Sequence, residues 1–136
     1  MKPYAIIDSS QKPVVSVTFT GERGSDENFQ QYLEDLESCY VERKSIAIIF
    51  NASEAVIPKL AHQKKQALWI SIHWKLIQTY CKGTAYVIPN RAIRAVLKMI
   101  FNLQHQPAPY QIFSNISEAE SWVQHIMAAP RQASTI

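Results

Sequence analysis

Residues 45–51 have the sequence SIAIIFN, a nearly continuous apolar run that is rich in β-branched side chains. A run of this kind, without alternating polar residues, is typical of a strand that is covered on both faces. Segments with strand-like and helix-like spacing flank it on both sides. We therefore predict that residues 45–51 form a central strand of an α/β sheet with helices packed on it.

The residues before this strand predict a β-hairpin followed by a helix. Residues 4–7 form a short apolar run, and residues 14–20 alternate between apolar and polar side chains. Residues 8–13 are rich in turn formers, so the two strands should pair as a hairpin. Apolar residues then recur at helical spacing over residues 26–42, and Ser25 can cap this helix.

The residues after the central strand predict three more helices and two more strands. A long helix begins near Pro58 and ends at Tyr80, and Asn90 can cap the next helix. Ser117, with Glu120 three positions further on, makes a capping box for the last helix. The two further strands are residues 84–88 and residues 110–113.

The predicted fold is an α/β open mixed sheet in the order β-β-α-β-α-β-α-β-α. Right-handed crossovers make the later strands parallel, and the opening hairpin supplies one antiparallel strand. Residues 46–50 and 85–88 should form interior strands that are neighbours or near neighbours. The row of the long helix that we expect to face the core is Leu68, Ile72, Leu76 and Tyr80. The residues predicted to be buried are Ile48, Leu68, Ile72, Val87, Leu97 and Trp122.

The composition is typical of one globular domain. The chain has 136 residues, of which 47% are hydrophobic and 18% are charged. We expect a single domain over residues 1–129 and a disordered tail over residues 130–136. No apolar run approaches the ~18 residues of a transmembrane helix. Cys39 and Cys81 are expected to be reduced thiols, which predicts a cytoplasmic location.

Charge is distributed unevenly along the chain. Residues 1–54 carry a net charge of −4, whereas residues 55–117 contain eight Lys and Arg and no Asp or Glu. A positive surface attracts an acidic protein, a small anionic ligand or an anionic membrane surface. Nucleic acid is disfavoured because no recognised motif accompanies the charge, and simple solvated helix faces are the alternative. The candidate anion or partner site is the helix start formed by Asn90, Arg91, Arg94 and Lys98.

The second half of the long helix is apolar on nearly all sides, so it must be covered on more than one face. Burial under other elements of the same chain is one explanation. The alternatives are a homodimer contact, a groove for an apolar ligand and peripheral contact with a membrane. The candidate residues for such a contact are Trp69, His73, Trp74 and Ile77.

The sequence carries no motif for catalysis or cofactor binding. Its four histidines and two cysteines do not have metal-ligand spacing, and none of its three glycines belongs to a phosphate-binding motif. Ser53 and His62 can be nominated as a nucleophile and a base, but nothing distinguishes them from surface residues. We therefore predict no enzymatic activity, no metal and no cofactor.

Several segments resemble those of a known family. They are AIIFNAS at residues 47–53, AYVIP at residues 85–89, IFS at residues 112–114 and SEAESWV at residues 117–123. Over residues 3–128, the chain resembles the bacterial SpoIIAA-like branch of the STAS superfamily. The fold of this branch is also likened to the CRAL-TRIO lipid-binding domains.

The resemblance implies a non-enzymatic binding or regulatory module. STAS domains act as anti-sigma-factor antagonists or form the cytoplasmic part of sulphate transporters, and the antagonists carry a phosphorylatable serine in a DSSG-like segment. Here residues 51–58 read NASEAVIP, so Ser53 is only a weak candidate for phosphorylation. The likeness to CRAL-TRIO domains implies the alternative function, a carrier or sensor of a lipid or another small apolar or anionic ligand.

Overall fold

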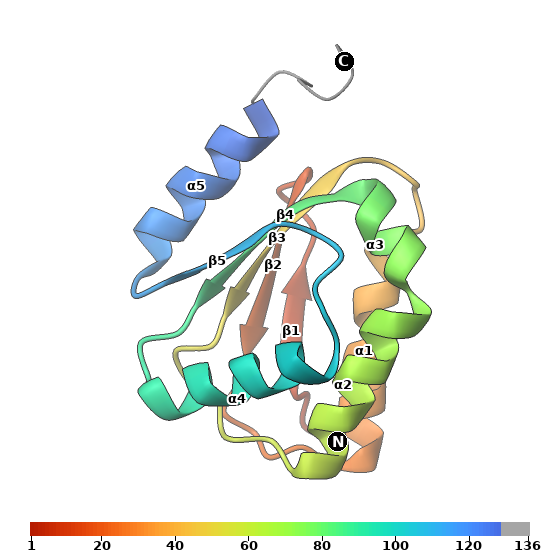
Figure 1. Cartoon of the computed structure of the whole chain (residues 1–136), viewed down its shortest axis with the longest axis vertical. Coiled ribbons are helices and arrows are strands. Elements are labelled where there is room, and N and C mark those ends of the chain that lie inside the picture. The colour runs from red at the N-terminus through yellow and green to blue at the C-terminus, as the bar shows by residue number, and fades with distance from the viewer. Residues whose placement is uncertain (129–136) are drawn as a thin grey trace.

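The structure, a computed structural model, describes residues 1–128, and within them five strands form one mixed sheet (Figure 1). The strands are β1 (Ala5–Asp8), β2 (Val14–Phe19), β3 (Ile46–Asn51), β4 (Cys81–Val87) and β5 (Tyr110–Phe113). They lie in the order β1-β2-β3-β4-β5, with β1 antiparallel to β2 and all other neighbours parallel. The predicted α/β mixed sheet is confirmed. The predicted tail, residues 130–136, and residue 129 lie outside the described residues.

The helices of residues 1–128 begin close to the positions that the capping signals predict. They are α1 (Asp26–Ser38), α2 (Leu60–Ile72), α3 (Trp74–Tyr80), α4 (Arg91–Leu103) and α5 (Ile116–Ala128). Ser25 caps α1, and its hydroxyl accepts a hydrogen bond from the backbone N–H of Asn28. Asn90 caps α4 and accepts from two backbone N–H groups. Both caps confirm the sequence predictions.

No helix in this part of the chain combines the length and the apolar composition needed to cross a bilayer.

The cap of α5 differs from the prediction. Asn115, rather than Ser117, supplies the capping oxygen, which accepts from the backbone N–H of Glu118 at 3.0 Å. The Asn115 amide in turn donates to Glu118 Oε1 at 2.9 Å. The prediction was wrong because the sequence holds two overlapping capping patterns, and the one that begins at Asn115 is the one used.

β3 is the central strand, as predicted. Ile48 is opposite Val15 of β2 on one side and Thr84 of β4 on the other. Residues 46–50 are all buried, which agrees with a strand covered on both faces. β3 and β4 are therefore interior neighbours, and this prediction is confirmed.

β4 begins at Cys81 rather than at residue 84. Gly83 lies inside the strand, directly under α5. A Cβ atom at Gly83 would come within 3.1 Å of Ile126 and 3.2 Å of the Trp122 ring. The pair Lys82-Gly83 is a helix-stop signal in the sequence, but here glycine allows the helix and the strand to approach closely.

Helices cover the two faces of the sheet unequally. Helices α1 to α4 pack on one face, and within the described residues α5 is the helix on the other face, over β3, β4 and β5 (Figure 1). Alternation along β3 directs Ile48 and Phe50 to the larger core, whereas Ala47 and Ile49 contact the α5 side. The larger core lies between the sheet and α1 to α4.

The single long helix predicted from Pro58 to Tyr80 is wrong. The chain breaks at His73, where φ is −100° and ψ is 19°, and two shorter helices, α2 and α3, result. Both Leu68 and Ile72 are exposed, with relative accessibilities of 59% and 68%. The core-facing residues of the two helices are instead His62, Gln63, Ala67, Ile70 and Ile77.

The physical reason is that two neighbouring rows of this segment are both apolar, so their periodicity cannot decide which row is buried. The buried row also contains polar His62 and Gln63, which weakens its apolar pattern. Of the other predicted core residues, Ile48 and Val87 are buried. Leu97 and Trp122 are only partly buried, at the edges of the two cores.

Candidate ligand-binding pocket

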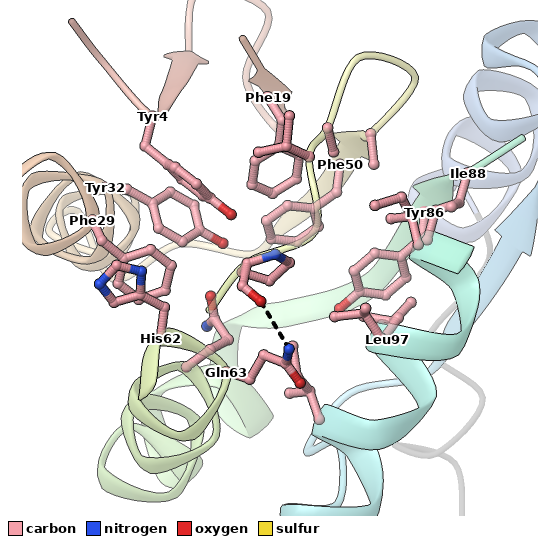
Figure 2. A pocket seen from close by; sticks show the side chains of 18 of the residues that line it. Tyr4, Phe19, Phe29, Tyr32, Phe50, His62, Gln63, Tyr86, Ile88 and Leu97 are labelled. Carbon is pink, nitrogen blue, oxygen red and sulfur yellow. Dashed lines mark hydrogen bonds between the residues drawn. The ribbon is translucent and has the colours of Figure 1, made fainter. Parts of the chain in front are cut away.

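A pocket of about 100 Å³ lies between the sheet and the helices of the α1–α4 face (Figure 2). Its walls come from Tyr4 ahead of β1, the carboxyl ends of β2, β3 and β4, and helices α1, α2 and α4. The carboxyl edge of the parallel strands is where open α/β sheets commonly bind ligands. The pocket therefore lies where this class of fold favours a binding site.

Aromatic side chains from three neighbouring strands line the sheet side of the pocket. Phe19, Phe50 and Tyr86 lie near the carboxyl ends of β2, β3 and β4. The ring centroids of Phe19 and Phe50 are 6.1 Å apart, and those of Phe50 and Tyr86 are 5.1 Å apart, with nearly parallel planes in both pairs. Strand alternation places all three rings on the same face, and they form a flat apolar floor.

The helices supply the remaining walls. Phe29 and Tyr32 come from α1, and Ile93 and Leu97 from α4. Residues three or four positions apart share one face of a helix, so the apolar face of α4 covers the pocket over two turns. The Asn90 cap, which accepts from the N–H groups of α4, determines where this helix begins.

Two polar residues of α2, His62 and Gln63, are buried beside the pocket. The Gln63 amide donates to the Pro58 carbonyl at 2.9 Å and so ties the β3–α2 loop to the helix (Figure 2). The His62 ring stacks on the Phe29 ring, with Nε2 3.2 Å from Asp26 Oδ1. This hydrogen bond holds the pKa of the exposed Asp26 carboxyl below its ordinary value.

The other ring nitrogen of His62, Nδ1, is buried and has no hydrogen-bond partner within residues 1–128. It lies against Gly24, where a Cβ atom would come within 2.8 Å of it. The absence of a side chain at Gly24 therefore leaves room for the imidazole. The His62 ring therefore lines the pocket, and its Nδ1 atom lies against the backbone of Gly24.

The described residues that line the pocket include no Asp, Glu, Lys or Arg. Three tyrosines line it, Tyr4, Tyr32 and Tyr86, and their hydroxyls point into it (Figure 2). Burial raises the pKa of Tyr4 to about 12, and burial also raises the pKa values of Tyr32 and Tyr86 above the ordinary value. The hydroxyls therefore stay protonated at neutral pH, so each can donate and accept a hydrogen bond.

The structure places the four predicted anion-site residues on α4 or at its cap, outside the pocket lining. The Asn90 side-chain oxygen already accepts from the N–H groups of Ala92 and Ile93. Arg94 donates from Nε to the Ile88 carbonyl at 2.6 Å and from its terminal nitrogen to Ser114 Oγ at 3.1 Å. Arg91 and Lys98 are exposed. Anion binding by these residues stays a prediction, but two of the four already make structural hydrogen bonds.

Arg94 should contribute to stability, because it joins the loops that follow β4 and β5. We expect Arg94→Ala to lower the free energy of unfolding by about 1–2 kcal/mol, since it removes hydrogen bonds from a charged donor. Arg91→Ala, on the same helix but exposed, should change it by less than about 0.5 kcal/mol. Urea unfolding of both variants tests this, and equal losses would contradict a structural role for Arg94.

The four candidates for an apolar or dimer contact do not line the pocket. Ile77 is buried in the larger core, and Trp69 packs against the same core. The Trp69 ring also stacks on the His73 ring, with 4.4 Å between the ring centroids. His73 Nε2 lies 3.3 Å from Glu37 Oε1 of α1. Trp74 is half-buried. These contacts support the explanation that other elements of the same chain cover the helix.

Ser53 is exposed in the turn after β3, where its backbone N–H donates to Asn51 Oδ1 at 3.1 Å. Its phosphorylation stays a prediction.

The pocket itself was not predicted, although the sequence contains a pattern that indicates it. An aromatic residue, Phe19, Phe50 or Tyr86, stands near the end of each of three successive parallel-strand segments, and alternation places all three on the same side of the sheet.

The strand order and the helices on both faces of the sheet define the class of fold, an α/β fold of the SpoIIAA-like type. A solved structure from Shewanella loihica PV-4, an uncharacterised protein of the DUF3478 family with a SpoIIAA-like fold, is similar to this chain. The similarity covers 88% of this chain and 91% of that chain, with a TM-score of 0.63 and 16% sequence identity. No family model matches the chain, and no curated protein matches it. The likeness therefore establishes the fold.

Proposed function

We propose that the protein is a non-enzymatic binding module that holds a small apolar ligand in the pocket, as a carrier or sensor of that ligand. The observation that carries the proposal is the pocket of about 100 Å³ with a stacked aromatic floor at the carboxyl edge of the sheet. Its apolar walls support binding rather than catalysis. The free thiols of Cys39 and Cys81 support a reducing compartment such as the cytoplasm.

The volume limits what the pocket can enclose. Pockets for drug-sized ligands usually measure roughly 300–1,000 Å³, whereas a dry apolar cavity of about 150 Å³ takes up benzene. The pocket, at about 100 Å³, is smaller than that cavity, so it encloses at most one ring or a short alkyl group. A longer lipid would leave the rest of its chain outside, along the mouth of the pocket.

Benzene should stabilise the protein by binding in the pocket. At a concentration about tenfold above its Kd, a ligand raises the free energy of unfolding by about 1.4 kcal/mol. This corresponds to a rise in the melting temperature of roughly 4–8 °C for a domain of this size. The measurement is thermal unfolding, followed by circular dichroism, at increasing benzene concentration. Absence of any stabilisation would contradict the proposed function.

A matched pair of variants on α4 assigns the effect to the pocket. Val96 lines the pocket, whereas Met99 on the same helix is exposed. Val96→Trp should fill the space and abolish the stabilisation by benzene, while Met99→Trp should keep it. Equal stabilisation of both variants would place benzene at another site.

A further inference from the structure

The three tyrosine hydroxyls of the pocket come from separate elements and converge on one space. Tyr4 lies just before β1, Tyr32 on α1 and Tyr86 on β4. The ring centroids of Tyr4 and Tyr32 are 5.4 Å apart, and Tyr86 stacks on Phe50 at the other end of the aromatic floor. Figure 2 shows the hydroxyls pointing toward the middle of the pocket from its two sides.

The three tyrosine side chains are largely buried, and their hydroxyls face the open space of the pocket. The relative accessibilities of Tyr4, Tyr32 and Tyr86 are 7%, 5% and 9%. Burial is the largest cause of the raised pKa in each. A hydroxyl that faces an otherwise apolar pocket takes its hydrogen-bond partner from water or from a ligand in that pocket. Phenylalanine would fill the same core positions without needing such a partner.

A ligand with its own polar group would satisfy the hydroxyls. A phenolic hydroxyl both donates and accepts, so three of them can bind a hydroxyl, carbonyl or amide group. Among the described residues, the lining has no Lys or Arg to pair with a carboxylate and no acid to pair with an ammonium group, and its one histidine, His62, already pairs with Asp26. A charged group in this space would be buried without a partner, which is more costly than burying a neutral one.

We infer that the pocket is specific for a neutral amphipathic ligand, with an apolar ring or short chain against the aromatic floor and an uncharged hydrogen-bonding group held by Tyr4, Tyr32 and Tyr86. This inference rests on the proposed function, because it concerns the same pocket. It adds the chemical class of the ligand. A water molecule can occupy the same polar position, and a ligand that displaces it binds well only if it restores these hydrogen bonds.

The test compares phenol, benzene and benzoate as probes, with Kd measured by calorimetry at pH 7. An entirely apolar pocket binds benzene more tightly than phenol, because the phenol hydroxyl would be buried unpaired. The inference predicts the opposite order, with phenol bound about three- to tenfold more tightly than benzene. Benzoate should bind at least about tenfold more weakly than phenol, because no cation lines the pocket.

Variants assign the preference to the hydroxyls. Tyr32→Phe and Tyr86→Phe should each lower the affinity for phenol about three- to tenfold and change that for benzene less than about twofold. Tyr40→Phe is the matched control, because Tyr40 is also buried but does not line the pocket. Tyr32→Phe should leave the melting temperature nearly unchanged, since it keeps the buried ring and removes only the hydroxyl that faces the pocket.

The outcomes separate this inference from the proposed function. If benzene binds more tightly than phenol, or if the Tyr→Phe variants keep the preference for phenol, the inference is wrong and the proposed apolar site stands. If benzoate binds most tightly, the ligand is anionic and the neutral class is wrong. If none of the three probes binds, the proposed function fails together with the inference.

Discussion

Raising the pH from 9 to about 11.5 should unfold the protein, because four tyrosines are buried in the larger core. Burial raises the pKa of Tyr4 to about 12, and it also raises the pKa values of Tyr32, Tyr40 and Tyr86 above the ordinary value of 10. The ionised forms of these side chains are therefore compatible with the unfolded chain and not with the folded one.

The direction of the effect follows from proton linkage. Below pH 10 the four tyrosines are protonated in both states, so they add no pH dependence. Above pH 10 the unfolded chain loses tyrosine protons that the folded protein retains, so the free energy of unfolding falls by about 1.4 kcal/mol per pH unit for each tyrosine. Four tyrosines together amount to about 5–6 kcal/mol per unit, which is comparable with the whole stability of a typical domain, about 5–15 kcal/mol.

The buried thiols act in the same direction from a lower pH. Burial raises the pKa of Cys39 to about 11 and also raises that of Cys81. The measurement is circular dichroism between pH 8 and pH 12, recorded together with tyrosinate absorbance. The share of the absorbance that comes from the four buried tyrosines should change together with the circular dichroism, and Tyr32→Phe should move the midpoint to higher pH. Tyr110→Phe is the control, because Tyr110 is 45% exposed. Ionisation of all six tyrosines while the fold stays intact would contradict the prediction.

Ile77→Ala should lower the free energy of unfolding by about 2–5 kcal/mol, the usual result of truncating a buried isoleucine. Ile77 is 6% exposed and belongs to the larger core, between α3 and the sheet. Ile72→Ala is the matched control on the other side of the break at His73. Ile72 is 68% exposed, so its truncation should change the free energy of unfolding by less than about 1 kcal/mol.

Urea unfolding measures both values, and the ratio of the two losses is the informative quantity. Similar losses for the two variants would mean that Ile72 is buried in solution, on the core-facing row that the sequence predicts. A large loss for Ile77→Ala alone would support the burial of Ile77 and the exposure of Ile72.

Strand positions were predictable because the information is local. The period-two alternation of residues 14–20 and the apolar run of residues 45–51 each identify a strand without reference to the rest of the chain. The caps at Ser25 and Asn90 are equally local, since each cap bonds to N–H groups within the next three residues. The right-handed crossover rule then makes the later strands parallel.

The division of the long helix was not predictable in this way. Residues 60–80 have two apolar rows, and either row can face a core. The choice depends on the shape of the surface that α1 and the sheet present, which local sequence does not encode. The contact of His73 with Glu37 of α1 belongs to that surface.

The anion-site candidates show the same limit. Asn90 and Arg94 stand out in the sequence because they lie at a helix start within a basic segment. In the fold, Arg94 meets Ile88 and Ser114, which come from the ends of two different strands. Arg94, which the sequence marks as a candidate for anion binding, thus holds two loops together.

The sequence by itself determined the positions of the five strands, the mixed sheet with β3 at its centre and the caps of α1 and α4, because each depends on periodicity or on hydrogen bonds within a few residues. Only the tertiary structure decided which face of α2 is buried and that a pocket exists. The pocket is formed by residues as distant in the chain as Tyr4 and Leu97, and its volume is the space that their packing leaves unfilled. Such a space is a property of several surfaces meeting, so it appears only when the strands and helices are assembled.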